Sequence, residues 1–263
     1  MKERKPRRIV FILCLVLLIA AIAAVAGYIW QREKSEKTMS EVQDSVRTEL
    51  SEAEEEIPET EEEETISIPV DFSKLQEENP DIYAWIYIAD TNVDYPILQS
   101  ETDDDYYLYR NMYGESDTAG SIYTQYSYNS GCFEDNVTVI YGHNMRNDSM
   151  FGQLSEYQDE EFRKEHSVIE IYTPEHIYTY RIVFAVTYND SHLLASYNCD
   201  ETDGCQDLLD AIRENRTIPS WIEDPFPVTA EDKLIILSTC NGNSSQRYLV
   251  GAVLEQTEPG NSD

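Results

Sequence analysis

Basic side chains are scarce in this sequence. Of its 263 residues, 19 are Lys or Arg and 51 are Asp or Glu, which gives a formal net charge of −32. A chain this negative is repelled by nucleic acid, so binding of nucleic acid through a general basic surface is excluded. The 10 Gly and 10 Pro are also few, whereas the 19 Tyr favour strands over low-complexity sequence.

Histidine and cysteine are sparse too, with four His and five Cys. No pair of His has H-x-x-x-H spacing and no C-x-x-C occurs, so the sequence predicts no metal site. A G-x-S-x-G elbow and a phosphate-binding glycine loop are both missing, and no cofactor is expected. Five Cys are too few for a disulfide scaffold, although a Cys199–Cys205 bridge remains open.

The N-terminal part of the chain has the pattern of a membrane anchor. Residues 1–8 form a basic end, and residues 9–30 follow without a charge. These 22 residues make a helix about 33 Å long, enough to span a bilayer. The positive-inside rule then places the N-terminus in the cytoplasm and the rest outside. The alternative is a cleaved signal peptide, because Ala24-Val25-Ala26 resembles an A-x-A cleavage site.

Composition divides the remainder into three segments. Residues 31–70 hold 14 acidic and four basic side chains, and we expect them to form a disordered stalk. Residues 71–257 hold 34 acidic and ten basic side chains and form the folded domain. Residues 258–263 are expected to be a loose polar tail.

The pattern of the folded domain is mainly β. Short apolar runs between turn residues predict eight strands, at 85–88, 93–98, 120–123, 137–141, 168–172, 177–188, 233–237 and 248–254. Eight short strands favour a closed barrel or a sandwich. Helices are expected over 71–79 with a further turn at 82–85, and over 150–164 and 205–215.

Cys240 has the most suggestive context for chemistry. It ends the strand Lys-Leu-Ile-Ile-Leu-Ser-Thr-Cys, and Arg247 opens the next strand after a short turn. The strand would fix the thiol, the loop would leave it open, and the cation would stabilise negative charge beside it. The competing interpretation is a buried structural cysteine. His143 also follows a strand, in Val-Ile-Tyr-Gly-His-Asn-Met. His166 and His176 stand in strongly polar sequence and are expected at the surface, and His192 has no distinguishing context.

These segments together resemble a sortase. The resemblance is carried by Tyr141-Gly142-His143-Asn144-Met145 with Met150-Phe151, and by Leu237-Ser238-Thr239-Cys240 with Arg247. The Asn79-Pro80 helix end, the Trp85-Ile86 and Asp94-Tyr95-Pro96-Ile97 runs and the helical insertion before residue 233 resemble class B of that family. The family implies a closed eight-stranded β-barrel, with short N-terminal helices and a helix in the insertion before the strand that carries Cys240.

The resemblance also implies a reaction and a role for each residue. Cys240 would attack a sorting motif near the C-terminus of an exported protein and form a thioacyl-enzyme. His143 would transfer protons, and Arg247 would hold the substrate carbonyl or its oxyanion. Ser238 and Thr239 are expected to contact substrate. Some class B members have an acidic residue shortly after the cysteine, where this chain has Asn241-Gly242, so no third catalytic residue is assigned.

The implied partners are exported proteins with a sorting motif and an amine of the cell-wall precursor or of a pilin. A Gram-positive-type bacterium is implied, with the catalytic domain outside the cell. Two alternatives stay open at this point. One is a wall enzyme similar to L,D-transpeptidases, although the seven-residue gap from Cys240 to Arg247 disfavours it. The other is a non-enzymatic, membrane-tethered surface assembly protein in which Cys240 only packs in the core.

Overall fold

The structure is a computed structural model that describes residues 4–47, 66–215, 217–240, 243 and 245–261. The chain divides into two compact units, Met1–Val42 and Gln43–Asp263. The first unit holds most of helix α1 (Arg4–Val46). The apolar part of α1 is long enough to cross a membrane, a property that signal sequences share.

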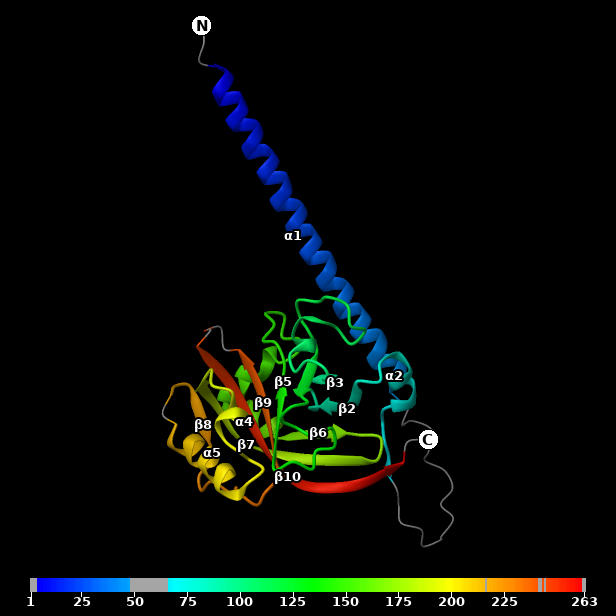
Figure 1. Cartoon of the computed structure of the whole chain (residues 1–263), viewed down its shortest axis with the longest axis vertical. Helices are drawn as coiled ribbons and strands as arrows, with labels where there is room; N and C mark the ends of the chain where they lie inside the picture. Colours follow the sequence, from blue (N-terminus) through cyan, green and yellow to red (C-terminus); the bar gives the residue numbers. More distant parts are fainter. Residues whose placement is uncertain (1–3, 48–65, 216, 241–242, 244, 262–263) are drawn as a thin grey trace. The chain divides into compact units, whose positions relative to one another are not determined.

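Eight strands of the second unit close into a barrel (Figure 1). They follow one another around it in the order β10-β9-β5-β4-β3-β2-β6-β7, and β7 pairs back with β10. Their bounds are β2 (Ile82–Tyr87), β3 (Asp94–Ser100), β4 (Ile122–Gln125), β5 (Val137–Tyr141), β6 (Val168–Tyr172), β7 (His176–Asn189), β9 (Leu234–Cys240) and β10 (Gln246–Asn261). Each corresponds to one of the eight expected strands, so the predicted closed barrel is confirmed.

Two short strands extend this sheet and were not expected from the sequence. Strand β1 (Ile66–Ser67) runs parallel to the end of β10, and β8 (Ser220–Ile222) pairs with β7. Both are only two or three residues long. Runs this short have no readable alternation of apolar and polar residues, which explains why the pattern did not reveal them.

The two faces of β9 are buried against different parts of the molecule. Leu234 and Ile236 belong to a core cluster with the apolar face of helix α5 (Thr202–Glu214), which lies in the insertion between β7 and β9. Successive side chains of a strand point to opposite faces. Ile235, Leu237 and Thr239 therefore point into the barrel. The helix predicted over 205–215 is present as α5, and its apolar residues cover the outer face of β9.

Helix α2 (Phe72–Glu78) agrees with the predicted helix over 71–79. Asp71 caps it by accepting a hydrogen bond from Lys74 N at 3.0 Å, and the helix ends at Asn79, before Pro80. The further helical turn predicted at 82–85 is wrong, because these residues belong to β2. Strand pairing with β3 buries Ile82 and Ala84, which accounts for the difference.

The helix predicted over 150–164 is divided into two pieces. Residues Gly152–Gln158 form the 3₁₀ helix η2, and Glu160–Glu165 form helix α3. Asp159 between them is extended, with ψ 135°, and its carboxylate accepts from Glu161 N and Phe162 N. This cap starts a new helix in place of continuing the first.

The chain also differs from the predicted segment boundaries at both ends of the domain. Helix α1 continues to Val46, and Arg47 forms an ion pair with Asp94 at 2.6 Å, inside the segment expected to be a stalk. The Glu-rich run 48–65 lies outside the described residues. At the C-terminus, β10 continues to Asn261, so the expected loose tail is paired with β7 and β1 over its described part.

Candidate active site

Cys240 is the last residue of β9 and is exposed to solvent. Cys199 and Cys205, in contrast, are buried in the core cluster beside α5. The interpretation of Cys240 as a buried structural cysteine is therefore wrong. Asn241 and Gly242, where an acidic third residue would stand, lie outside the described residues.

Arg247 lies directly opposite Cys240 across the antiparallel pair of β9 and β10. On its other side, Arg247 is opposite Tyr188 of β7. Opposed residues of an antiparallel pair place their side chains on the same face. Cys240, Arg247 and Tyr188 therefore form a row across three strands on the outer face of the barrel, and Tyr188 was not identified from the sequence.

Ser238 and Thr239 point to different faces. Ser238 is two residues before Cys240 and shares its outer face, although it is buried. Thr239 is 3% exposed and points into the barrel, where its hydroxyl lacks a hydrogen-bond partner among the described residues. Of the two expected substrate contacts, only Ser238 has its side chain on the face of Cys240.

The loop that carries His143 begins where β5 leaves its neighbour β9. Tyr141 is opposite Ser238 in this parallel pair, and Gly142 N donates to Ser238 O at 3.2 Å. A Cβ atom at position 142 would lie 2.5 Å from Ile122 Cδ1 and 2.7 Å from Phe151 Cδ2. Glycine therefore allows the chain to turn tightly against the barrel at this point.

The His143 ring is held from the side of the 3₁₀ helix η1 (Tyr106–Tyr109). Its Nε2 lies 2.7 Å from Leu108 O, and its ring centroid is 5.3 Å from that of Tyr109. A carbonyl oxygen only accepts hydrogen bonds, so Nε2 carries a proton in this arrangement. In the neutral ring, Nδ1 is then the nitrogen able to accept a proton.

A hydrogen bond joins the loop of His143 to the end of β9. Asn144 Nδ2 donates to the main-chain oxygen of Cys240 at 2.7 Å. The residue after His143 is therefore in direct contact with the residue proposed as nucleophile, although 96 positions separate the two in the sequence. The structure thus brings His143, Cys240 and Arg247 to the same end of the barrel.

The pKa of Tyr141 responds to charged groups at this end of the barrel. Burial raises the pKa of Tyr141 above its ordinary value, and the Asp105 carboxylate adds to that increase. The Arg247 charge lowers the same pKa, which indicates that the guanidinium lies near the Tyr141 phenol. The cationic Arg247 and the anionic Asp105 therefore both act on Tyr141. Asp105 also accepts a hydrogen bond from Gln125 Nε2 at 3.1 Å.

His192 lies close to this region, which its local sequence did not indicate. Its ring is 4.3 Å from that of Tyr128 and 6.4 Å from that of Tyr141. His192 Nδ1 accepts from Ala195 N at 3.1 Å, and Nε2 lies 2.6 Å from Gln125 Oε1. These contacts attach the short helix α4 (Leu193–Ser196) to the barrel through strand β4.

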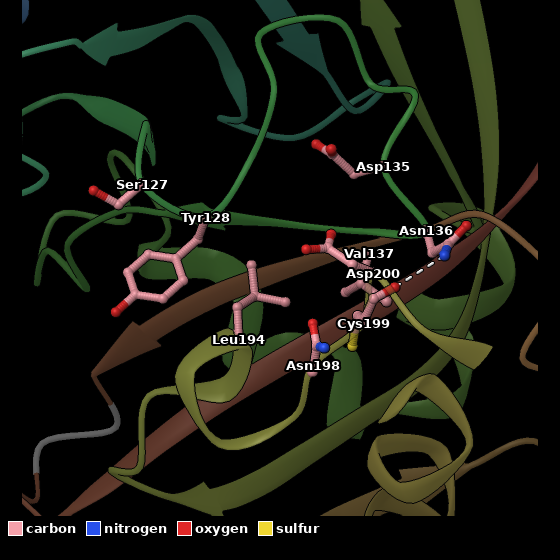
Figure 2. Close-up of a pocket in the computed structure, with 9 residues that line it drawn as sticks. All are labelled: Ser127, Tyr128, Asp135, Asn136, Val137, Leu194, Asn198, Cys199 and Asp200. Atoms are coloured by element: carbon pink, nitrogen blue, oxygen red, sulfur yellow. Dashed lines mark hydrogen bonds between the residues drawn. The ribbon is translucent and has the colours of Figure 1, made fainter. Parts of the chain in front are cut away.

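A pocket of about 250 Å³ lies beside α4, and Figure 2 shows its lining. It is bordered by Ser127, Tyr128, Asp135, Asn136, Val137, Leu194, Asn198, Cys199 and Asp200. Asn136 Nδ2 donates to Cys199 O at 2.9 Å across this lining. The lining contains neither Cys240, His143 nor Arg247, so this pocket is not the site of the proposed chemistry.

Cys199 and Cys205 are free thiols in this structure. Cys205 Sγ donates to Cys199 O at 3.2 Å. Burial raises the pKa of Cys199 to about 12, and the neighbouring Cys205 adds to the increase. Both groups are consequently poor nucleophiles in the folded protein, unlike an exposed thiol.

Comparisons with known proteins identify the family. The model of the sortase domain matches residues 86–255. Sortase B of Listeria monocytogenes is 38% identical over 169 residues, which cover 64% of this chain and 65% of that protein. Sortase B of Staphylococcus aureus is 28% identical over 177 residues, which cover 66% of this chain and 69% of that protein. The chain thus matches slightly less than two thirds of the length of the Listeria protein.

Solved structures agree with this result. The crystal structure of sortase B from Bacillus anthracis in complex with AAEK2 is 29% identical to this chain, with a TM-score of 0.65. The match covers 85% of this chain and 97% of that one. The same barrel is therefore present in a solved sortase B.

Proposed function

This chain belongs to class B of the sortase family, and we propose that it is a membrane-anchored cysteine transpeptidase. Its substrates are exported proteins with a C-terminal sorting motif. The acceptor is an amine of the cell-wall precursor or of a pilin. The convergence of Cys240, Arg247 and the His143 loop at one exposed end of the barrel is the observation that carries the proposal.

In the first half-reaction, the Cys240 thiolate attacks the carbonyl carbon of the scissile peptide bond. A C–S bond forms, the C–N bond breaks, and His143 gives its proton to the departing amine. Because His143 Nε2 is occupied by Leu108 O, the proton transfers through Nδ1. In the second half-reaction, an acceptor amine loses a proton to His143 and attacks the thioester, which releases Cys240. Hydrolysis is the competing reaction.

Arg247 stabilises the oxygen of the substrate carbonyl while negative charge develops on it. Its place opposite Cys240 in the ladder of β9 and β10 suits this role. The planar guanidinium can direct two N–H groups to one acceptor. Ser238, on the same outer face, is proposed to contact substrate, whereas the position of Thr239 offers no support for such a contact.

Incubation of the protein with a library of sorting-motif peptides and a short amine, followed by intact-mass analysis, tests this function. We expect a covalent adduct on Cys240 whose mass equals the acyl part of the peptide, and a bell-shaped pH profile for turnover. Cys240→Ala should form no adduct, and the control Cys132→Ala should behave as wild type. Turnover by Cys240→Ala would exclude the cysteine mechanism.

The apolar helix α1 fits a single membrane anchor. We propose that it stays uncleaved, with the barrel on the outer side. Protease added to intact cells should then release a soluble fragment that contains Cys240, and membranes should retain the N-terminus. A mature protein that begins at Gly27 would identify the segment as a signal peptide and contradict the anchor.

The family assignment removes one of the earlier alternatives. A sortase domain over residues 86–255 is incompatible with an L,D-transpeptidase-like enzyme. The non-enzymatic alternative loses its core-packed Cys240, because that residue is exposed. An assembly protein with an exposed Cys240 would still form no thioester with any peptide, so the peptide experiment decides between the two.

A further inference from the structure

The hydrogen bond from Asn144 to Cys240 has a defined place in the sheet. β5 and β9 are parallel, and their pairing ends with Tyr141 opposite Ser238. The last main-chain bond beyond this pair runs from Gly142 N to Ser238 O, at 3.2 Å. Hydrogen bonds of one direction recur every second residue along a parallel pair. The next bond would therefore run from residue 144 to the oxygen of Cys240.

Asn144 donates this next hydrogen bond to the oxygen of Cys240 from its side chain, and not from its main-chain N–H. Its Nδ2 donates to Cys240 O at 2.7 Å. The main chain of the loop has already turned away, since Phe151 N donates to His143 O at 3.0 Å and Asn144 forms a β-bridge with Met150. The carboxamide thus extends the ladder by one step after the strand β5 has ended.

We propose that Asn144 is a positioning residue, which holds the His143 loop in register with the end of β9 that carries Cys240. This inference rests on the proposed function. His143 is fixed on one side by Leu108 O, and the residue after it is fixed to Cys240 on the other. Transfer of a proton between two groups requires their separation to be kept within a fraction of an ångström.

The side chain at this position must donate a hydrogen bond without carrying negative charge. A carboxamide N–H donates to a carbonyl oxygen, whereas an ionised carboxylate only accepts. Aspartate at 144 would also place a negative charge beside the thiolate. Protonation of that aspartate at low pH would restore one O–H donor, so its effect should depend on pH in a way that a purely structural defect would not.

The variants Asn144→Ala and Asn144→Asp test this role, and Asn92→Ala is the matched control. Asn92 Nδ2 also donates to a main-chain oxygen of this loop, that of Asp148 at 3.2 Å, but not to Cys240. Asn144 and Asn92 are both exposed, so removal of either side chain should leave the fold intact. Circular dichroism and thermal melting of all three variants verify this condition.

Two measurements are made on each variant. The first is kcat and KM for cleavage of the best peptide from the library. The second is the rate at which iodoacetamide alkylates Cys240 between pH 5 and pH 9, followed by peptide mass spectrometry with the exposed Cys132 as internal reference. The second measurement needs no substrate and reports how His143 influences the thiol.

For Asn144→Ala we expect kcat to fall by about tenfold to a hundredfold, with KM within about twofold of wild type. Alkylation of Cys240 near pH 6.5 should slow by about threefold or more, because a displaced imidazolium stabilises the thiolate less. At pH 8, Asn144→Asp should be less active than Asn144→Ala. As the pH falls and the aspartate is protonated, the rate of Asn144→Asp divided by that of Asn144→Ala should increase. Asn92→Ala should stay within about twofold of wild type in both measurements.

The inference is overturned if folded Asn144→Ala keeps its kcat and its alkylation rate within about twofold of wild type, or if Asn92→Ala loses as much as Asn144→Ala. Failure of the proposed function gives a different result. If the wild-type protein forms no thioacyl adduct on Cys240 with any peptide, the proposed transpeptidase function is refuted. The alkylation rates of wild type and Asn144→Ala then still decide whether Asn144 positions the two groups.

Discussion

Cys240 and Arg247 face each other across the antiparallel pair of β9 and β10. Main-chain register fixes this relationship, so a substitution at 247 changes the group beside the thiol without moving the strand that carries it. The pairing of β10 with β7 places Tyr188 on the other side of Arg247. The cation therefore has a defined position between the solvent-exposed end of β9 and a buried tyrosine.

Arg247→Lys should keep the positive charge and still lose most activity. The compact ammonium of lysine lacks the planar fork with which a guanidinium directs two N–H groups to one acceptor. Removal of one oxyanion donor typically lowers kcat by about 10²–10³, and we expect a loss in this range from peptide cleavage kinetics. Arg181→Lys is the control, because Arg181 pairs with Glu223 and Glu255 elsewhere on the barrel. Near wild-type kcat for Arg247→Lys would refute the role of the guanidinium fork.

The thiols should differ strongly in reactivity while the protein is folded. Cys240 and Cys132 are exposed and should be alkylated near pH 8. With a pKa of about 12, only roughly 10⁻⁴ of Cys199 is thiolate at that pH, so its labelling should stay negligible and rise as the pH approaches 12. Burial raises the pKa of Cys205 as well. Time-resolved mass spectrometry checks this order, and rapid native labelling of Cys199 would contradict it.

Gly142→Ala should impair turnover by displacing the His143 loop. The added methyl group would meet Ile122 and Phe151 at 2.5–2.7 Å, and Phe151 is fully buried. Overpacking of this kind costs about 1–3 kcal/mol, and we expect kcat to fall more than tenfold. Gly131→Ala is the control, because its nearest neighbour would lie at 3.5 Å. Equal effects of the two substitutions on kcat would contradict a specific role for the turn at 142.

Thr239→Val should stabilise the barrel and leave turnover intact. The substitution removes a buried hydroxyl that lacks a partner among the described residues, and such a group costs about 1–3 kcal/mol. We expect a gain of about 1 kcal/mol, which raises Tm by about 2–4 °C for a unit of this size. Thr124→Val should lower Tm, because the Thr124 hydroxyl bonds with Tyr83 and Gln99. A large increase in KM for Thr239→Val would instead restore Thr239 as a substrate contact.

Local sequence was sufficient to predict most of the elements of this fold. The eight barrel strands were found because short apolar runs, rich in β-branched and aromatic residues, stand between turn residues. The predictions were wrong where two structures compete for the same residues. At 82–85 the pairing of β2 with β3 replaces a helical turn, and at Asp159 a side-chain cap divides one helix into two.

The chemical types at the candidate site were also readable from sequence, because Cys240, His143 and Arg247 each stand beside the end of a strand. Their juxtaposition was not readable from spacing. Asn144 and Cys240 are 96 positions apart and meet because β5 and β9 are parallel neighbours. Parallel pairing joins strands that are distant in the sequence, so it depends on how the whole barrel closes.

The sequence by itself therefore predicted the eight barrel strands and named Cys240, His143 and Arg247 as candidates for chemistry, because both predictions depend on a few neighbouring residues. Only the tertiary structure decided that Thr239 points into the barrel, that Tyr188 borders Arg247 and that Asn144 reaches Cys240. These relationships depend on the order and register of strands around the closed sheet, and the energies that fix that register come from contacts between residues far apart in the chain.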